Sequence, residues 1–407
     1  MSHIRIITYD NFPYGGASAN LLRYFSLSLS LEGNNVEVVM PTGNNYGKNI
    51  DSNVKRSGKV ENVRFKHLAY LNHPQNFIGK ALDIFLGFIN TIGFILKESF
   101  KSELDIIIIY NTVFSRYLSI FLLSKILGKK LIVILPEFYE KPNTNFWSLA
   151  RIKWTDFYLG IKYLSKYADG FFVASHYLKN YLEKERHILK PIYVLPNLMD
   201  PSLFQSENEK PFIENTITIG YTGTPTRKDG VVDLIKSFSL LHKKYDNTHL
   251  LIIGDVTNRG QSVLPPLIEL ASSLGVKDDI TFTGLVAFSR IPNLINQCQI
   301  LALTRPNGVF AEAGFPTKLG EYFACKKPVL ITRVGDIPLY FDDCKEVKIV
   351  EPDNVESIFL GFEELINDPD LCSKLSKNSF EWMNKNLNFR NVSGMLSAFT
   401  KKVKILP

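Results

Sequence analysis

The sequence has few of the residues that build disulfide frameworks or zinc sites. Its 407 residues include four cysteines, all in the second half: Cys298, Cys325, Cys344 and Cys372. None stands in a CxxC pair, and no His/Cys cluster has the spacing of a zinc site. We therefore expect free core thiols in a reducing compartment and no bound metal.

A signal peptide and a long uninterrupted hydrophobic run are also missing. The N-terminus enters a strand-like segment, Ile4–Thr8, without a basic region followed by an apolar one. The most apolar window, Ile84–Leu96, is broken by Asn90 and is shorter than the roughly 20 residues that span a bilayer. We expect a cytoplasmic protein, with peripheral contact at the inner face of the cell membrane as the alternative to a freely soluble one.

Low-complexity tracts are absent, and the charge is unevenly placed. The net charge is +7; residues 1–199 carry 24 Lys and Arg against 15 Asp and Glu, whereas residues 200–407 carry 23 against 25. The basic first half fits an anionic partner, such as a membrane surface or a phosphorylated acceptor, or else scattered solubilising lysines. No nucleic-acid-binding motif accompanies the charge, so nucleic acid is not expected as a partner.

Strands and helices alternate along the chain, which predicts an α/β protein with two Rossmann-like, doubly wound domains. A turn-rich segment with two prolines, residues 196–201, marks the boundary. We place an N-terminal domain at residues 1–196 and a C-terminal domain at residues 197–387, with a helix at about 388–407 that packs back on the first. Residues 43–66 are rich in Asn, Gly, Lys and Ser and are predicted to form a mobile surface loop.

The stretch Gly314–Thr332, GFPTKLGEYFACKKPVLIT, contains a predicted helix between a loop and a buried strand. Thr317 is expected to cap the helix through its hydroxyl, and Lys326–Lys327 to lie in its last turn. Lys318 and Glu321 are three residues apart, so they share one face. A helix N-terminus beside a cation suits a phosphate, and a carboxylate one turn later suits the paired hydroxyls of a ribose. The stretch outlines a nucleotide-sugar site.

A second candidate segment is the loop Gly223–Gly230, GTPTRKDG, between a predicted strand and helix. Arg227 and Lys228 lie next to the N-terminus of that helix, an arrangement that binds phosphate. Two solvated basic loop residues are the alternative. Gly254 and Gly284 follow later strands, and their bare backbone would let a flat base approach.

The first half offers weaker signals. Gly15 and Gly16 follow the first strand in a loop that is not a GxGxxG fingerprint, so they either line a ligand site or form a plain turn. Glu137 and Glu140 follow the strand predicted at 131–135, where side chains of an open parallel sheet face the ligand crevice. Solvated loop charges are the alternative for these two glutamates.

Two further features of the first half can each be interpreted in two ways. His176 opens a predicted helix and is an acceptor-side candidate, with a structural role as the other interpretation. The segment 150–167 mixes lysines and an arginine with aromatic residues. Such a helix fits a membrane interface, or a core helix whose lysines extend to solvent.

Five segments of the second half, in order, resemble the family 4 glycosyltransferases of the GT-B fold: PNLMD, GYTGTPTRKDG, LLIIGD, ITFTGLV and GFPTKLGEYFACKKPVLIT. The resemblance covers roughly residues 190–387; in the first half it rests on the Gly15–Gly16 loop and on residues 168–182. It implies two Rossmann-like domains with a nucleotide-sugar donor between them. It also implies transfer to an acceptor hydroxyl with retention of anomeric configuration, without a divalent metal or another cofactor. No DxD motif stands at a predicted strand end, which agrees with the last point.

Carried over by position, the resemblance makes Glu321 the second glutamate of the family's Glu-x7-Glu pair, which holds the ribose hydroxyls. Lys228 matches the lysine that neutralises the diphosphate. The implied donor-binding residues are Gly15, Gly16, Gly223, Arg227, Lys228, Leu285, Val286, Gly314, Phe315, Pro316, Thr317, Lys318, Leu319 and Glu321.

The sequence departs from this pattern at two positions. The family's first glutamate is Ala313 here, and its neighbour Glu312 is the candidate replacement, so the predicted catalytic residues are Lys228, Glu312 and Glu321. The arginine expected after Gly223 is Thr224, and Lys318 is a candidate substitute for it. The predicted mechanism is electrostatic, with lysines and helix N-termini stabilising the leaving diphosphate.

The expected acceptor is a saccharide or lipid-linked molecule of cell-surface polysaccharide or glycolipid assembly, contacted by the first domain. Two alternatives stay open. A nucleotide-sugar epimerase shares the two-domain architecture but needs carboxylates and a histidine that converge on the sugar. A non-catalytic homologue that serves as a partner subunit would account for the missing first glutamate.

Overall fold

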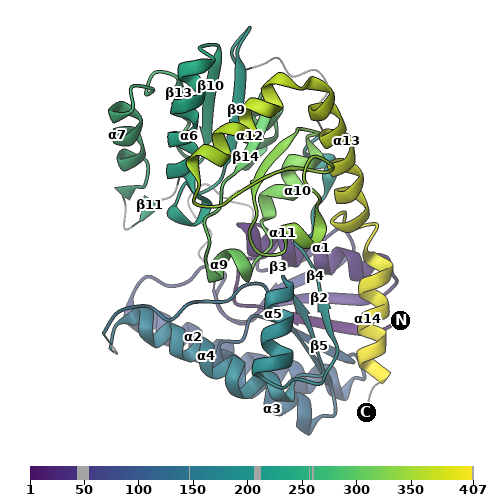
Figure 1. Cartoon of the computed structure of the whole chain (residues 1–407). Helices are drawn as coiled ribbons and strands as arrows, with labels where there is room; N and C mark the ends of the chain where they lie inside the picture. Colours follow the sequence, from purple (N-terminus) through teal and green to yellow (C-terminus); the bar gives the residue numbers. More distant parts are fainter. Residues whose placement is uncertain (44–54, 146, 206–211, 256, 259–260, 406–407) are drawn as a thin grey trace. The chain divides into compact units, whose positions relative to one another are not determined.

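The protein, described by a computed structural model, divides into two compact units. Unit 1 comprises residues 1–199 and 389–407, and unit 2 comprises residues 200–388. The structure describes residues 1–43, 55–145, 147–205, 212–255, 257–258 and 261–405. Each unit is built on its own sheet of mainly parallel strands with helices packed against it (Figure 1). The predicted α/β class with two Rossmann-like domains is confirmed.

The sheet of unit 1 has the strand order β3-β4-β2-β1-β5-β6-β7-β8. The strands are β1 His3–Ile7, β2 Asn35–Met40, β3 Ser57–Val60, β4 Val63–His67, β5 Ile106–Tyr110, β6 Lys130–Leu135, β7 Gly170–Val173 and β8 Ile192–Val194. The central strands are nearly continuous runs of buried Ile, Leu and Val, as expected where helices cover both faces of a parallel sheet. The order reverses between β1 and β5, so the loops after these strands flank the topological switch point.

The prediction of a mobile loop at residues 43–66 is wrong for its second half, and residues 44–54 lie outside the described residues. β3 and β4 form an antiparallel hairpin that adds to the sheet through β2. Val63 and Phe65 point into the core while Arg64 lies exposed between them. The basic residues that alternate with the apolar ones hid this two-residue period in the sequence.

The helices of unit 1 are α1 Ala17–Leu31, α2 Phe77–Phe100, α3 Phe114–Ile126, α4 Leu149–Tyr163, α5 His176–Asn180 and α14 Ser393–Ile405. The C-terminal α14 packs beside α1, and the Phe399 ring lies 4.7 Å from the Phe172 ring of β7. Ser28 of α1 donates a hydrogen bond of 2.7 Å to the carbonyl oxygen of Phe389, just before this helix. The chain thus closes the core of unit 1 with its last residues.

Helix α2 is the one helix among the described residues that is long and apolar enough to cross a membrane by length and composition. It has 24 residues, more than the window Ile84–Leu96 on which the sequence-based exclusion of a membrane span rested. The argument that the apolar segment is too short to span a bilayer is therefore wrong, because α2 exceeds the roughly 20 residues that a span requires. Only 28% of the apolar window of α2 is buried.

The main sheet of unit 2 is entirely parallel, in the order β13-β10-β9-β14-β15-β16. Its strands are β9 Ile217–Thr222, β10 Thr248–Ile253, β13 Ile280–Phe282, β14 Ile300–Leu303, β15 Val329–Thr332 and β16 Lys348–Val350; β11 Thr257–Asn258 and β12 Gln261–Ser262 form a separate short hairpin. The helices are α6 Val231–Lys244, α7 Pro265–Ser273, α8 Ile291–Asn296, α9 Val309–Glu312, α10 Thr317–Ala324, α11 Ile337–Tyr340, α12 Val355–Asn367 and α13 Pro369–Asn386. The strand order reverses between β9 and β14, so a ligand site is expected at the carboxyl ends of these two strands.

Candidate active site

The loop Gly223–Gly230 leaves β9 at the switch point and enters α6 through a 3-10 turn, Arg227–Asp229. Gly230 has a left-handed φ of 68°, and a Cβ there would lie 1.6 Å from the carbonyl oxygen of Thr304, which follows β14. The Thr304 hydroxyl donates to the Gly230 carbonyl oxygen at 2.9 Å. Glycine is required here by this close approach, which ties the loop after β9 to the end of β14.

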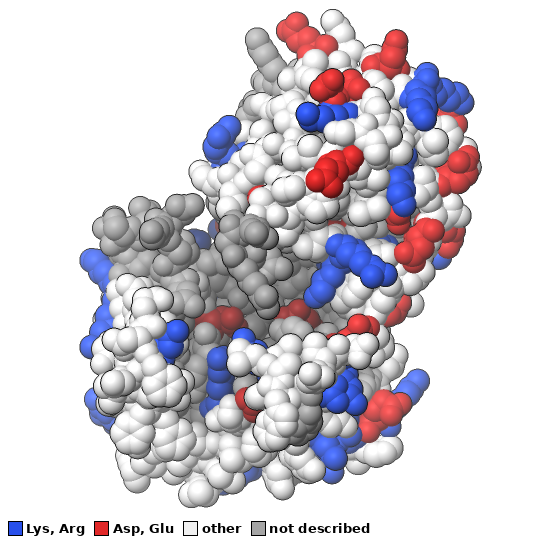
Figure 2. Space-filling model, turned by 90° about the vertical axis from the view of Figure 1, so that its left-hand side faces the viewer, with Lys and Arg blue, Asp and Glu red and all other residues white. Residues whose placement is uncertain are grey.

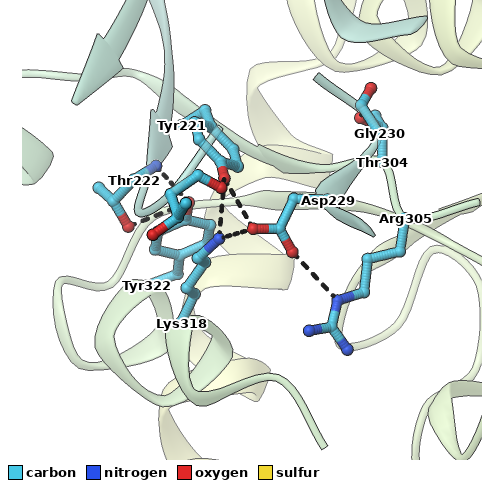
Figure 3. Close-up of polar contacts among 9 residues, drawn as sticks. Tyr221, Thr222, Asp229, Gly230, Thr304, Arg305, Lys318 and Tyr322 are labelled. Carbon is cyan, nitrogen blue, oxygen red and sulfur yellow. Dashed lines mark hydrogen bonds and ion pairs between the residues drawn. The ribbon is translucent and has the colours of Figure 1, made fainter. Parts of the chain in front are cut away.

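Four side chains converge behind this loop (Figure 3). The Lys318 ammonium, from α10, pairs with the Asp229 carboxylate and donates to the Tyr221 hydroxyl at 2.9 Å. The Tyr221 hydroxyl donates to Asp229 Oδ2 at 2.7 Å, and Arg305 Nε lies 3.4 Å from Asp229 Oδ1. The network joins β9, the loop after it, the end of β14 and α10.

The ionisation of this network follows from its burial. Burial raises the pKa of Asp229, but Lys318 and Arg305 outweigh it and hold that pKa below the usual range. Burial lowers the pKa of Lys318, and Asp229 opposes this shift. One carboxylate between two cations leaves a net positive charge at the carboxyl end of the sheet, where an anionic ligand would be stabilised.

Gly223 makes room for Lys318. A Cβ at this glycine, whose φ is 117°, would lie 2.3 Å from Cε and 2.6 Å from Nζ of Lys318. The lysine side chain therefore runs directly against the backbone at the end of β9. This contact explains physically why glycine, rather than a residue with a side chain, follows the strand.

Glu321 lies one turn after Lys318 on α10 and differs from every member of the network. It is partly exposed, and its carboxyl group makes no hydrogen bond or ion pair with any other described residue. Burial raises the pKa of Glu321 to about 7, and Lys318 opposes this shift only in part. A half-buried carboxyl group without a protein partner is available to accept hydrogen bonds from a ligand.

The two basic residues of the loop are not part of the network. Arg227 and Lys228 are exposed, and neither has an anionic partner among the described residues. Lys228 Nζ lies 5.9 Å from the centre of the Phe310 ring of α9. The structure thus places Lys318, rather than Lys228, in the buried part of the site, and leaves Lys228 at its rim.

The candidate replacement for the missing glutamate lies on α9. Glu312 Oε1 is 3.4 Å from the backbone nitrogen of Gly335, which donates to it, and Glu312 is partly buried. Ala313 is fully buried. A glutamate side chain at position 313 would have to fit into this packed position. The carboxylate of the neighbouring Glu312 instead lies beside the backbone nitrogen of Gly335.

Two expectations about α10 are wrong. The helix starts at Thr317 with Pro316 as its N-cap, and no side chain caps it. It ends at Ala324, so Lys326 and Lys327 lie beyond it; Lys326 takes a left-handed φ of 53°, and Lys327 donates to the Asn296 carbonyl oxygen at 2.7 Å. The apolar spacing that predicted the helix continues into the turn that precedes β15, which is why the end was placed too late.

Some of the other predicted donor-binding residues are buried in the core of unit 2, and others lie at its surface. Leu319 and Phe315 are buried; the Phe315 ring lies 5.8 Å from Tyr340, so both side chains support α10 from behind. Gly314 and Pro316 line a narrow crevice beside them, and Thr317 is partly buried. Leu285 is 66% exposed and Val286 partly buried, in the loop that follows β13.

Unit 1 contains a cavity of about 930 Å³ at its own switch point. Its lining includes Asp10 after β1, Arg116 on α3, and Glu137 and Glu140 after β6. The Tyr139 hydroxyl donates to Glu137, and burial raises the pKa of Asp10 against the opposing charge of Arg116. The two predicted glutamates thus lie at one cavity.

The remaining first-half candidates, Gly15, Gly16 and His176, do not share one cavity. Gly16 lines a second cavity of about 310 Å³ with Asp10 and Arg116. At Gly15 a Cβ would lie 2.9 Å from the Cβ of Ala19, so this glycine permits close packing of the loop on α1. His176 is the first residue of α5 and lines neither cavity.

The sequence analysis missed Tyr221, Asp229 and Arg305. Arg305 could have been found, because it follows β14 just as Gly223 follows β9, and both strand ends border the switch point. The pairing of Asp229 with Lys318 could not, since the two residues are 89 positions apart. The described residues contain no group of three or more His, Cys, Asp and Glu that could hold a metal ion.

The segment that carries this site is similar to a known protein family. Residues 204–382 match the family described as "Glycosyl transferases group 1". The matched segment contains the whole Lys318 network, Glu321 and the loop Gly223–Gly230, so the site described above lies inside the part of the chain that is similar to this family.

The relatives and the solved structures cover different parts of the chain. A GDP-mannose-dependent alpha-(1-6)-phosphatidylinositol monomannoside mannosyltransferase of Mycobacterium tuberculosis is 25% identical over 177 residues, 43% of this chain and 44% of that protein. The chain therefore matches less than half the length of this relative. Sucrose-phosphate synthase from Thermosynechococcus elongatus has a TM-score of 0.73 at 15% identity over 99% of both chains. Anabaena HepE in complex with UDP also has a TM-score of 0.73, at 14% identity, over 99% of this chain and 100% of that one. Identities this low show the fold, the two Rossmann-like domains of the GT-B architecture.

Proposed function

We propose that the protein is a glycosyltransferase that moves a sugar from a nucleoside-diphosphate sugar to an acceptor hydroxyl. The observation that carries the proposal is the pairing, on α10, of a partly buried lysine with a carboxyl group that has no partner among the described residues. Lys318 adds positive charge at the switch point of unit 2, and Glu321 offers free acceptor oxygens one turn away. A diphosphate is stabilised by positive charge, and the hydroxyls of a ribose need hydrogen-bond acceptors.

In the proposed reaction, unit 2 binds the donor and stabilises the leaving group. Lys318 and Arg305 supply positive charge from partly buried side chains, and the exposed Lys228 and Arg227 add charge at the rim. The diphosphate gains negative charge as the glycosidic bond breaks, so cations held in place before the reaction lower its barrier. Glu321 would accept hydrogen bonds from the ribose hydroxyls. The proposal includes retention of configuration and independence of divalent metal and other cofactors, both drawn from the resemblance to family 4 glycosyltransferases.

We assign the acceptor to unit 1. Its 930 Å³ cavity is lined by Asp10, Glu137 and Glu140, whose carboxylates suit the hydroxyls of a saccharide. The Mycobacterium tuberculosis relative is named for a glycolipid acceptor. This supports a role in glycolipid or cell-surface polysaccharide assembly, in the cytoplasm and in contact with the membrane.

The donor assignment is tested by thermal stabilisation. The melting temperature is measured with UDP-glucose, GDP-mannose and other nucleotide sugars, since a ligand that binds the folded state raises it. At least one compound should raise the melting temperature, and Glu321→Ala should abolish that shift while Glu381→Ala, an exposed position on α13, keeps it. A shift that survives in Glu321→Ala, or no shift with any compound, would contradict the assignment.

The buried Ala313 favours a second candidate, a partner subunit without catalytic activity. In that case the purified protein would transfer no sugar even where a nucleotide sugar binds. An epimerase would convert the bound nucleotide sugar without any acceptor, so incubation with labelled donor alone separates it from a transferase. For a transferase we expect the labelled sugar to leave the nucleotide only when an acceptor is added, and to be recovered on that acceptor.

A further inference from the structure

The first half of helix α2 buries its polar side and exposes its apolar side, whereas the second half also buries Phe94 and Ile95. The residues that it turns toward unit 1 in its first half are Asp83, Gly87 and Thr91, all fully or nearly fully buried. Its large exposed side chains include Phe77, Ile78, Ile84, Phe85, Phe88 and Ile89. A surface helix in water has the opposite distribution. Phe77 is 86% exposed and Ile78 72%, too much apolar surface in one place for a face that meets only water.

The polar side of α2 is bound firmly to unit 1. The Asp83 carboxylate accepts hydrogen bonds from the backbone nitrogen of Gly43 at 3.0 Å and of Tyr70 at 3.3 Å, and lies 2.6 Å from His73 Nδ1. At the other end Glu98 pairs with the buried guanidinium of Arg5 at 2.8 Å. Crossing a bilayer would require α2 to leave these partners and carry both carboxylates into hydrocarbon, which costs several kcal/mol. The helix therefore stays on unit 1, and only its outer face is available.

The charge around this face is positive. Both acidic residues of α2 are buried, so its exposed charges are Lys80 and Lys97. Unit 1 as a whole carries 28 Lys and Arg against 15 Asp and Glu. Figure 2 shows a face of unit 1 that is largely uncharged, with Lys and Arg side chains and fewer Asp and Glu side chains around it. An apolar face bordered by lysines is complementary to an anionic lipid surface.

The segment at the start of α4 also exposes apolar side chains next to a lysine. Trp147 is 82% exposed, and Leu149 and Ile152 are exposed as well. Lys153, which is also exposed, lies among them on α4. Tryptophan with lysine beside exposed aliphatic side chains is typical of segments at the level of lipid headgroups.

The acceptor cavity of unit 1 opens between these two elements. Ile84 and Phe88 of α2 line it, together with Lys153 and Trp154 of α4. The same two α2 side chains belong to the exposed apolar face, so cavity and face are continuous. The polar residues that line the cavity include Asp10, which follows β1, and Arg116 on α3.

We propose that the outer face of α2 docks on an anionic lipid surface and that the adjoining cavity receives the polar head of an acceptor anchored in that surface. The apolar part of such an acceptor would leave the cavity past Ile84 and Phe88 and enter the lipid directly. The acceptor part of this inference rests on the proposed function; the docking part does not. A second copy of the chain is a poorer occupant of the face, because two identical faces would bring their exposed lysines together.

The docking part is tested by sedimentation with vesicles. The full chain is mixed with vesicles of equal parts phosphatidylglycerol and phosphatidylcholine, or of phosphatidylcholine alone. We expect binding to the anionic vesicles that weakens with added salt, and a tenfold or greater loss of partition in the triple variant Ile78→Gln, Phe85→Gln, Ile89→Gln. These three side chains are exposed and do not line the cavity, so folding and the cavity are preserved. The matched control Leu31→Gln, Leu339→Gln, Leu360→Gln, which also removes exposed apolar side chains, should bind like the unaltered protein.

Protein that stays in the supernatant at low salt, or equal binding by the two triple variants, would overturn the docking proposal. So would a dimer in solution that the α2 variant dissociates, because the face would then be an interface between copies.

The acceptor part is tested by incubating the protein with labelled nucleotide sugar and vesicles of a bacterial polar-lipid extract. Label is expected in the organic phase, and Phe88→Gln should reduce it while nucleotide-induced stabilisation is unchanged. Transfer to water-soluble glycans alone, with stabilisation intact, would overturn the lipid-anchored acceptor and leave the proposed function standing. Loss of nucleotide stabilisation in the unaltered protein would instead refute the proposed function.

Discussion

Replacing Glu321 by glutamine should stabilise the protein at alkaline pH. The carboxyl group has a pKa of about 7 in the folded state against an ordinary 4.5, because burial disfavours its charged form. The unfolded chain releases this proton more readily, so the folded state loses stability as the pH rises from about 4.5 to about 7. A difference of about 2.5 units corresponds to about 3 kcal/mol above pH 7. Partial exposure reduces this figure, and we expect a gain of about 1–3 kcal/mol from the neutral glutamine.

The gain must depend on pH in the stated direction. At pH 5 most of the folded protein already carries the proton, so Glu321→Gln should change the free energy of unfolding by less than about 1 kcal/mol. At pH 8 the unaltered protein carries the charge, and the variant should be the more stable of the two. Urea unfolding at both pH values measures the difference directly.

The control is Glu381→Gln on the exposed face of α13, which should leave the free energy of unfolding unchanged at both pH values. An equal effect of Glu321→Gln at pH 5 and pH 8 would refute the reasoning. So would destabilisation at pH 8, since it would mean that Lys318 stabilises the Glu321 carboxylate by more than burial costs it. A site residue whose removal stabilises the protein is the usual sign that function, rather than folding, requires it.

Three further predictions concern the surrounding structure. Asp229→Ala leaves Lys318 and Arg305 without their shared carboxylate and should cost about 3–5 kcal/mol in urea unfolding, whereas a neutral result would show that the network is not buried as described. Gly223→Ala should abolish nucleotide-induced stabilisation, because its Cβ meets Lys318, while Gly275→Ala, also at positive φ but with open space around it, should keep that stabilisation; equal behaviour of the two would exclude the clash. Phe399→Ala removes a ring packed on Phe172 and should lower the free energy of unfolding of unit 1 by about 3–5 kcal/mol, measured by urea unfolding, and an effect below 1 kcal/mol would contradict the packing of α14.

The sequence predicted most of the fold because the composition of each strand segment is by itself typical of a buried strand. Runs such as Ile106–Tyr110 and Val329–Thr332 are apolar, β-branched and bounded by turn residues, and parallel strands buried on both faces have this composition. The hairpin of β3 and β4 was missed for the opposite reason, since lysines and arginines alternate with its few core residues. The end of α10 was misplaced because the left-handed turn at Lys326 uses a residue with no turn preference.

The site was predictable where neighbours in the sequence carry it and unpredictable where distant segments meet. Lys318 and Glu321 share a helix, so their spacing places them on one face. Which anion holds Lys318 depends on how the loop after β9 packs against α10, and that packing has no local signature. The sequence analysis named Lys228 as a catalytic residue and Lys318 as a donor-binding residue, whereas in the structure Lys318 lies in the partly buried network and Lys228 is exposed.

The two features that matter most for function both violate the ordinary distribution of polarity. In unit 2 a lysine, an aspartate and a glutamate lie at the end of a sheet where apolar side chains would fold more easily, and the glutamate has no partner among the described residues. In unit 1 a helix presents phenylalanine and isoleucine to the outside and keeps aspartate and glutamate within. Neither arrangement lowers the free energy of the isolated chain in water. In the two proposals a ligand makes each arrangement favourable, a nucleotide sugar in the first case and a lipid surface in the second, and this is the physical reason for proposing both.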